Sequence, residues 1–391
     1  MRKRVPAKHI KHQLRSIILA VTILSFCVFL VTVYPRLKSV SYTDMSPYIS
    51  TTIDYADGSQ ALLKGTEFGP INKGDKINME ISLPIEEKTD PSIMTFGANH
   101  AVTQVFFNDK LLTSYGEDIA ARGDLICHHN YFVEIPEDAW GQTITVSMEA
   151  TENRAFNRIA MVWLYPAGKA YQFYFDLEFG RMVVSFSVLI ISVTTLLAMP
   201  LLMQQWKKRY IQLLYMALFG IVSAMWMVLA EGLQQFFDVD SYLLTTLEFV
   251  GFIAQIIPLG CFVLAEEAIP ERRKMLKCLI GIDGFFVALI CVLNYCNISH
   301  FPETIWASVV FIIINGVVFA WNSLRSMDFS ITSKRASLLG VAVLSLTGIF
   351  DVIRFSLYRS IGLSIFNHTE KTFPLGVLIF YFFPSAVRNY K

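Results

Sequence analysis

The residues best equipped for chemistry lie in a polar stretch that contains three histidines and a glutamate. His100, His128, His129 and Glu134 carry side-chain atoms that bind transition metals. Neighbouring residues on a strand point to opposite faces of a sheet, so His128 and His129 cannot easily ligate one ion. The paired spacing of zinc motifs is missing as well. The sequence therefore predicts no metal site, and we expect no cofactor.

Aromatic side chains in the same part of the chain offer a different chemistry. Rings near the ends of a β-sandwich can stack on a sugar or grip a peptide. Four residues are candidates for such a ligand site: His129, Tyr131, Trp140 and Trp163. Packing in the core of the domain is the competing interpretation, and the sequence leaves both open.

A second group of candidates is charged and falls inside apolar stretches. Asp351 and Arg354 are three positions apart, so on a helix they share one face within pairing distance. Glu231 and Glu248 fall near the ends of two other apolar stretches, at a similar predicted depth. Because charge is costly inside a membrane, these side chains are expected to face a bundle interior or its outer mouth. They predict a polar cluster, which is either a structural ion pair or a ligand and switch site.

Four further residues in apolar stretches have both structural and functional interpretations. Asp283 carries the same ambiguity as the charged cluster. Asn315 and Asn322 are expected to form hydrogen bonds between helices. Pro258 is expected to kink the stretch that contains it, and a kink can serve as a hinge.

Catalytic motifs are not found in the sequence. Outside the N-terminal tail and the polar stretch, the remaining histidines are His300 and His368, both in short predicted outer loops. A membrane enzyme needs His, Asp or Glu residues gathered at one membrane face. We therefore expect no catalytic residues and no enzyme activity in this chain.

Composition indicates the kind of protein that holds these residues. Of 391 residues, 54% are hydrophobic and 17% are charged, whereas soluble domains carry about 25% charged residues. The mean hydropathy is +0.47, and these values favour a membrane protein. The net charge of +1 gives no indication of nucleic-acid binding. Cys127 is the one cysteine in a polar segment, so no disulfide is predicted.

The apolar stretches predict eight membrane-spanning helices. Residues 16–34 are uncharged, long enough to span a bilayer, and preceded by a basic tail at 1–15. A cleavable signal peptide is the alternative, but this stretch is long and lacks an Ala-x-Ala site, which favours an uncleaved anchor. Seven more spans are expected in residues 179–391, at 180–203, 210–232, 244–265, 278–296, 305–323, 336–358 and 373–387.

Basic residues alternate between the connections of these spans. Every second connection is rich in lysine and arginine, whereas the connections at 233–243 and 297–304 contain neither. Basic loops remain on the cytoplasmic side of a membrane. This pattern predicts that both termini are cytoplasmic and that residues 35–178 are extracytoplasmic. Removing one span from the count breaks the alternation.

The segment at 35–178 has the pattern of a separate β domain. VTQVFFNDKLLTSYG at 102–116 is predicted as a β-hairpin, since turn residues Asn108 and Asp109 stand between two apolar runs. Short alternating strands separated by turns predict an antiparallel all-β sandwich. Three other segments alternate apolar and polar residues: KINMEISL at 76–83, NYFVEIP at 130–136 and QTITVSME at 142–149.

Three segments and the order of parts carry a family resemblance. They are VFFNDKLLTSYG at 105–116, HHNYFVEIPEDAWGQTITVSME at 128–149, and the span with its basic start at 207–237. The anchor, the β domain and the seven spans resemble bacterial seven-transmembrane receptors with diverse intracellular signalling modules, over about 60–380. The resemblance implies a galactose-binding-like jelly roll outside the membrane. Members usually continue into a diguanylate cyclase, histidine kinase or phosphatase module, and no such signature precedes Lys391.

The resemblance implies an integral membrane sensor. Such a protein binds a small extracytoplasmic ligand, with a carbohydrate as a candidate, and passes a conformational signal to a cytoplasmic cyclase or kinase. The sequence leaves a homodimer open. Three alternatives remain: a polytopic transporter, a membrane-bound enzyme, or the receptor portion of a membrane-bound diguanylate cyclase or histidine kinase. A transporter predicts an inverted repeat, and none is found in the sequence.

Overall fold

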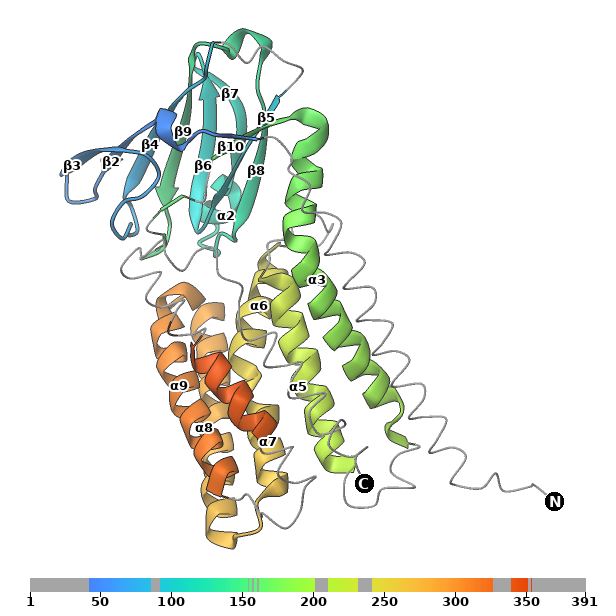
Figure 1. Ribbon diagram of the computed structural model, residues 1–391. Helices are drawn as coiled ribbons and strands as arrows, with labels where there is room; N and C mark the ends of the chain where they lie inside the picture. Colours follow the sequence, from blue (N-terminus) through green and yellow to red (C-terminus); the bar gives the residue numbers. More distant parts are fainter. Residues whose placement is uncertain are drawn as a thin grey trace.

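The fold is described from a computed structural model. The described residues are 42–85, 92–153, 155–156, 158–159, 162–200, 210–230, 241–325, 339–350 and 353. Figure 1 shows a β-sandwich above a group of long helices. The predicted anchor at 16–34 and the last predicted span at 373–387 lie outside the described residues.

The β-sandwich consists of two antiparallel sheets. The smaller sheet has the order β1-β10-β5-β8 and the larger has the order β3-β2-β4-β9-β6-β7. A short helix, α2 (Glu117–Ala121), follows β7. The strands are β1 (Thr43–Asp44), β2 (Ile49–Asp54), β3 (Gln60–Lys64), β4 (Lys76–Ser82), β5 (Ser92–Ala98), β6 (Ala101–Phe107), β7 (Lys110–Tyr115), β8 (His129–Glu134), β9 (Thr143–Ala150) and β10 (Trp163–Pro166).

Alternation in the sequence builds the core between these sheets. In β4 and β9 the apolar residues are buried and their neighbours are not, and in β8 Tyr131 and Val133 follow the same pattern. Burial also alternates along β6. A strand presents successive side chains to opposite faces, so each alternating segment covers one side of a shared core. The three alternating segments and the two-sheet prediction are confirmed. The core includes Ile53, Ile77, Met79, Ile81, Met94, Val105, Ile144 and Val146.

The predicted hairpin at 102–116 is confirmed as β6 and β7. Asn108 and Asp109 connect the two strands with φ values of 48° and 60°. Positive φ at both central residues matches the right-handed twist of the flanking strands, and Asn and Asp tolerate it better than most residues. Turn chemistry therefore sets the register of this edge of the larger sheet.

Long helices form the second region. The first, α3, continues directly from β10 without a linker (Figure 1). Four helical segments are long and apolar enough to cross a membrane: Tyr210–Leu229, Tyr242–Glu266, Pro270–Tyr295 and Phe301–Arg325. The helices are α3 (Ala167–Leu197), α5 (Tyr210–Leu229), α6 (Ser241–Ala254), α7 (Ile256–Glu266), α8 (Pro270–Tyr295), α9 (Phe301–Arg325) and a further apolar helix at Leu339–Phe350.

These four segments coincide with predicted spans, with two informative differences. The span expected at 278–296 begins earlier, at Pro270, because proline suits the first position of a helix. The span at 244–265 is interrupted at Gln255, between α6 and α7. Pro258 has no N–H and cannot bond the carbonyl of Ala254, which accounts for the break one turn earlier.

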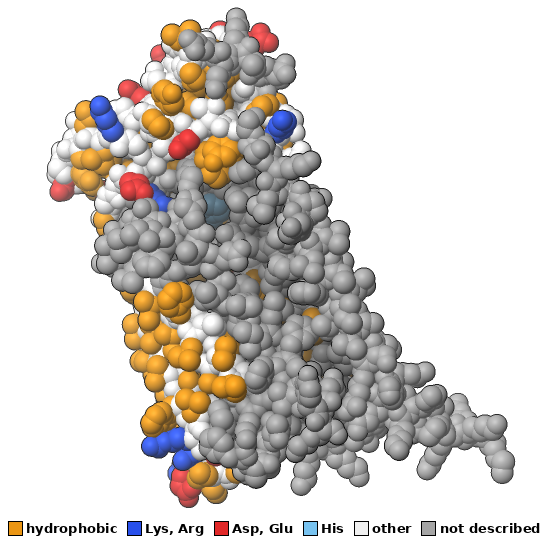
Figure 2. All heavy atoms as spheres, viewed as in Figure 1, with side chains coloured by type: hydrophobic (Ala, Val, Ile, Leu, Met, Phe, Trp, Pro, Cys, Tyr) orange, Lys and Arg blue, Asp and Glu red, His pale blue; other side chains and the backbone are white. Residues whose placement is uncertain are grey.

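The outer faces of α8 and α9 are apolar. On α9 the exposed residues Val310, Ile314, Val317 and Trp321 recur at intervals of three or four, which places them on one face. The exposed residues Ile282, Phe285, Leu289 and Val292 form a matching face on α8. Figure 2 shows hydrophobic side chains over this part of the molecule, with basic side chains near the end away from the sandwich. Such faces suit hydrocarbon rather than water.

Candidate functional site

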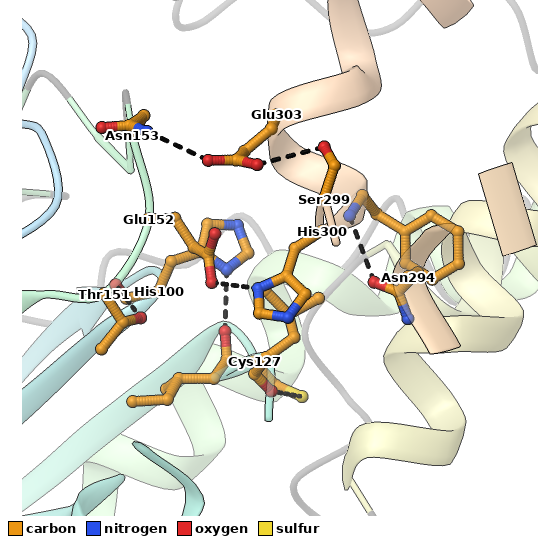
Figure 3. Close-up of polar contacts among 12 residues, drawn as sticks. His100, Cys127, Thr151, Glu152, Asn153, Asn294, Ser299, His300 and Glu303 are labelled. Carbon is orange, nitrogen blue, oxygen red and sulfur yellow. Dashed lines mark hydrogen bonds and ion pairs between the residues drawn. The ribbon is translucent and has the colours of Figure 1, made fainter. Parts of the chain in front are cut away.

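Polar and apolar side chains of the sandwich contact the ends of the helices at one site, which we call the junction. It contains the β5–β6 turn, the segments at 123–127 and 151–153, and the α8–α9 loop at 296–300 with the start of α9. Figure 3 shows these segments, which are far apart in sequence, meeting around His300.

An apolar contact forms one half of the junction. Leu125 from the sandwich is buried to 1% exposure against Ile253, Ile290 and Phe301 of the helices. Phe301 in turn stacks on Phe249, with ring centroids 5.1 Å apart. Burial of a leucine side chain contributes about 1.5–3 kcal/mol. Leu125 therefore anchors the sandwich to α6, α8 and α9.

An acid–histidine pair forms the polar half. His300 Nδ1–H donates to Glu152 Oε1 at 2.5 Å, and the two side chains are 13% and 3% exposed. The hydrogen bond to Glu152 raises the pKa of His300 above its usual 6.5, and the negative charges of Glu152 and Glu303 act in the same direction. Burial and Lys73 oppose this shift. The raised pKa favours a charged imidazolium paired with the carboxylate.

A second acidic residue extends the polar contact. Asn153 Nδ2 donates to Glu303 Oε1 at 3.0 Å, and Ser299 Oγ donates to Glu303 Oε2 at 3.1 Å. Glu303 lies in the first turn of α9, where a negative charge is favourable. The segment after β9 thus contacts the α8–α9 loop through Glu152 and the first turn of α9 through Asn153.

Local hydrogen bonds hold the sandwich side of the junction in place. The backbone N–H and Oγ1–H of Thr151 both donate to the His100 carbonyl at 2.9 Å. His100 Nδ1–H donates to the Ile126 carbonyl at 2.7 Å. Together these bonds connect the segments that carry Glu152 and Leu125.

The helix side is held equally well. Asn294 Oδ1 accepts from the Phe301 backbone N–H at 3.2 Å, and Asn294 Nδ2 donates to the Tyr242 hydroxyl at 3.1 Å. Asn297 adopts a positive φ of 52°, which allows the loop to turn tightly between α8 and α9. His300 is therefore presented by a short loop fixed at both ends.

The structure brings together two of the four predicted ligand-site aromatics. His129 stacks on Tyr115 with centroids 4.1 Å apart and meets Tyr131 edge-on at 4.7 Å. Trp140 packs against the sandwich core. Trp163 lies on the outer face of the smaller sheet beside Tyr165, whereas Tyr131 faces the core. The four residues therefore do not line one face, and the ligand site stays a prediction.

Histidines 128 and 129 are held neutral in the sandwich. His128 contacts Asn99 Oδ1 through Nδ1 and Asn130 Oδ1 through Nε2, and burial lowers its pKa. A neutral imidazole carries one N–H, so one of these amides presents its NH₂ group instead. Burial, with a smaller effect of His128, lowers the pKa of His129 to about 4. Within the described residues, no group of three or more His, Cys, Asp or Glu side chains is arranged to hold a metal.

The predicted charged cluster falls largely outside the described residues. Glu231, Asp351 and Arg354 are not described, and Glu248 lies half-buried on α6. The prediction of a polar cluster among these four residues is untested. Two other polar pairs lie between the helices: Asn315 Nδ2 donates to Asp283 Oδ1, and Ser223 Oγ donates to Gln255 Oε1, each at 3.0 Å. The prediction that Asn315 bonds between helices is confirmed, whereas Asn322 Nδ2 donates to the Val318 carbonyl of its own helix, α9.

Sequence reasoning did not identify the junction. The sequence places His300 in a short outer loop and indicates no role for it, for Glu152 or for Glu303. One sequence signal is present, because the loop at 297–304 contains a histidine and a glutamate but no lysine or arginine. Its partner segment could not be found from spacing, since the two are separated by 148 positions.

Comparison with known proteins adds no family. A scan against protein-family models gives no match to the chain. A search of curated proteins also gives no match. The resemblance to seven-transmembrane receptors therefore stays an expectation from the sequence.

Proposed function

We propose that the protein is a membrane sensor in which the β-sandwich receives an extracytoplasmic signal and passes it to the helices. The observation that carries this proposal is the junction. A domain tethered by a linker would move independently, but here Leu125 and Glu152 contact α6, α8 and α9 directly. In addition, β10 runs into α3 without a linker. A shift in the sandwich therefore has several rigid connections to the bundle.

The charge distribution supports the proposed orientation. The first turns of α8 carry Arg272, Arg273, Lys274 and Lys277, and the start of α8 lies at the end of the bundle away from the sandwich (Figure 1). The α8–α9 loop, at the sandwich end, has no lysine or arginine. By the positive-inside rule, the basic end faces the cytoplasm. The sandwich is then outside, and a cytoplasmic cyclase or kinase would read the opposite end.

The coupling can be tested without knowing the ligand. Hydrogen exchange is measured on the full chain in lipid nanodiscs, comparing the wild type with Leu125→Ala and Glu152→Gln. We expect both variants to change exchange in α8 and α9, including the first turns of α8. Leu62→Ala, on the exposed surface of β3, is the matched control and should change neither helix. Changes confined to the sandwich would contradict the proposal.

Ligand class needs a separate experiment. A panel of simple sugars is added to the full chain carrying a fluorophore at Met275→Cys, near the start of α8. We expect at least one sugar to change the fluorescence in the wild-type background and to have a weaker effect with Leu125→Ala. If no sugar has an effect, the carbohydrate part of the proposal is wrong. The hydrogen-exchange experiment tests the coupling of sandwich and helices independently of this result.

A further inference from the structure

Asp283 and Asn315 form a buried polar pair in the middle of the helix group. Asp283 lies on α8 and Asn315 on α9, and both are 0% exposed. Asp283 follows Pro270 by thirteen residues, which places it about 20 Å along α8. This pair is remote from the junction and plays no part in the sensor proposal above.

The hydrogen bonds of this pair are incomplete in a specific way. Asn315 Nδ2 donates to Asp283 Oδ1 at 3.0 Å and to the Phe311 carbonyl at 3.0 Å, so both of its N–H groups are used. Asp283 Oδ2 and Asn315 Oδ1 are buried and have no hydrogen-bond partner among the described residues. Both orphaned atoms are acceptors when the acid is ionised. The pair lacks a donor.

Apolar side chains pack above and below the Asp283–Asn315 pair, on the side toward the sandwich and on the side away from it. Toward the sandwich, Phe286 of α8 stacks on Phe311 of α9, with ring centroids 4.1 Å apart. Away from it, Gly260 of α7 lies so close that an added Cβ would be 2.8 Å from Phe319 Cζ and 3.0 Å from Ile280 Cγ1. Ile280 and Phe319 are one turn from Asp283 and Asn315 respectively. The carboxyl group is therefore enclosed by α7, α8 and α9.

Among the described residues, no counter-ion compensates a charge at this position. Within the described residues of α6, α7 and α9, no cationic side chain interacts electrostatically with the Asp283 carboxyl group. The titratable side chain that does interact with it is Cys261 of α7. Lys277, on α8 itself, is six residues and about 9 Å along the helix. A buried carboxylate without a cation costs several kcal/mol, whereas the neutral acid avoids most of that cost.

We propose that Asp283 is a proton-binding site, occupied at neutral pH, whose Oδ2–H donates to Asn315 Oδ1. A single proton supplies the missing donor, gives each orphaned oxygen a partner and removes the uncompensated charge. A trapped water would donate to both oxygens but leave the carboxylate charged. A sodium ion would find two free oxygens here, fewer than hard cations take. Loss of the proton then favours helix arrangements that admit water or a cation, which couples proton binding to packing.

Infrared spectroscopy of the full chain in lipid vesicles tests this inference. We expect the C=O stretch of a protonated carboxylic acid at neutral pH, and its loss in Asp283→Asn. Asn315→Leu retains the acid but removes its partner, so the band should persist and move to higher frequency. The second variant keeps the test decisive if the first does not fold.

Three outcomes would overturn the proposal. No acid band at neutral pH would show an ionised Asp283, with or without water. A band that stays in place in Asn315→Leu would show that the acid is not bonded to Asn315. A band that appears only when sodium is replaced by choline would identify a cation site instead. None of these results bears on the hydrogen-exchange test of the sensor, so the two proposals fail separately.

Discussion

The sandwich and the helix group differ in where their polar and their large exposed apolar side chains lie. Between the sheets the core is apolar, as Ile77, Met79 and Val146 are fully buried there. Between the helices, an apolar cluster that includes Phe219 and Phe319 also holds the polar pairs Asp283–Asn315 and Ser223–Gln255. Large apolar side chains cover the outer faces of α8 and α9. The same rule of burial produces both patterns if the first region is surrounded by water and the second by lipid.

The junction is where these two patterns meet, and it combines both. Leu125 contributes an apolar contact of the kind found inside the sandwich. Glu152 and His300 contribute a charged contact next to it. The contact between the water-facing domain and the lipid-facing helices is therefore part apolar and part charged.

The largest expected effect comes from placing charge in the sandwich core. Val146→Asp buries an unpaired carboxylate at a fully buried position, which costs at least about 4 kcal/mol and should unfold the sandwich. Ser147→Asp is the matched control, because its neighbours across the sheet are Asn78 and Gln104. Limited proteolysis of the full chain in detergent reports the result. Equal resistance of the two variants would contradict the described core.

A charge on the outer face of α9 is expected to have the next largest effect, on membrane insertion. It tests whether this face of the helix group contacts lipid. Ile314 is 52% exposed and Leu62, on β3, is 73% exposed. In lipid, Ile314→Lys should cost about 2.5–3.5 kcal/mol of insertion energy. Leu62→Lys, in water, should change stability by less than about 0.5 kcal/mol. The fraction of chain that inserts in a membrane is the measurement, and equal insertion would show that the face of α9 does not contact lipid.

Acid should weaken the sandwich through His129. The pKa of this side chain falls from 6.5 in the unfolded chain to about 4 in the fold, so the unfolded state binds more protons between these pH values. The stabilising contribution is present above pH 6.5 and is lost as the pH falls toward 4, by about 3 kcal/mol. Urea unfolding of the sandwich at several pH values measures it. His129→Phe should flatten this dependence, and an unchanged slope in that variant would reject His129 as its source.

Alkali should weaken the junction by a smaller amount, through His300. Its pKa is raised in the fold, so its contribution is complete below 6.5 and is lost as the pH rises through the folded value. The neutral ring can still donate from Nδ1, which limits the loss to about 1 kcal/mol. Hydrogen exchange of the α8–α9 loop at rising pH should therefore increase in the wild type. The same pH response in Glu152→Gln would exclude the ion pair.

The parts of the structure that could be predicted are those encoded by short-range patterns in the sequence. The β4 segment and the Asn108–Asp109 turn carry period-two alternation and turn chemistry, and both occur as expected. The four spans that coincide with predictions carry long apolar runs. The junction depends on Glu152 meeting His300 across 148 positions, and no local signal encodes that contact. The break at Gln255 was foreseeable from Pro258, but the partner of Gln255 on α5 was not.

Sidedness in the membrane is the most direct test of the whole account. Single cysteines at Leu62→Cys on β3 and Met275→Cys near the start of α8 occupy exposed positions, 73% and 46% respectively. In a cysteine-free background and in right-side-out vesicles, an impermeant maleimide should label position 62 at once and position 275 only after the membrane is opened. Labelling of both positions in sealed vesicles would contradict a sandwich and a basic helix end on opposite sides of the bilayer.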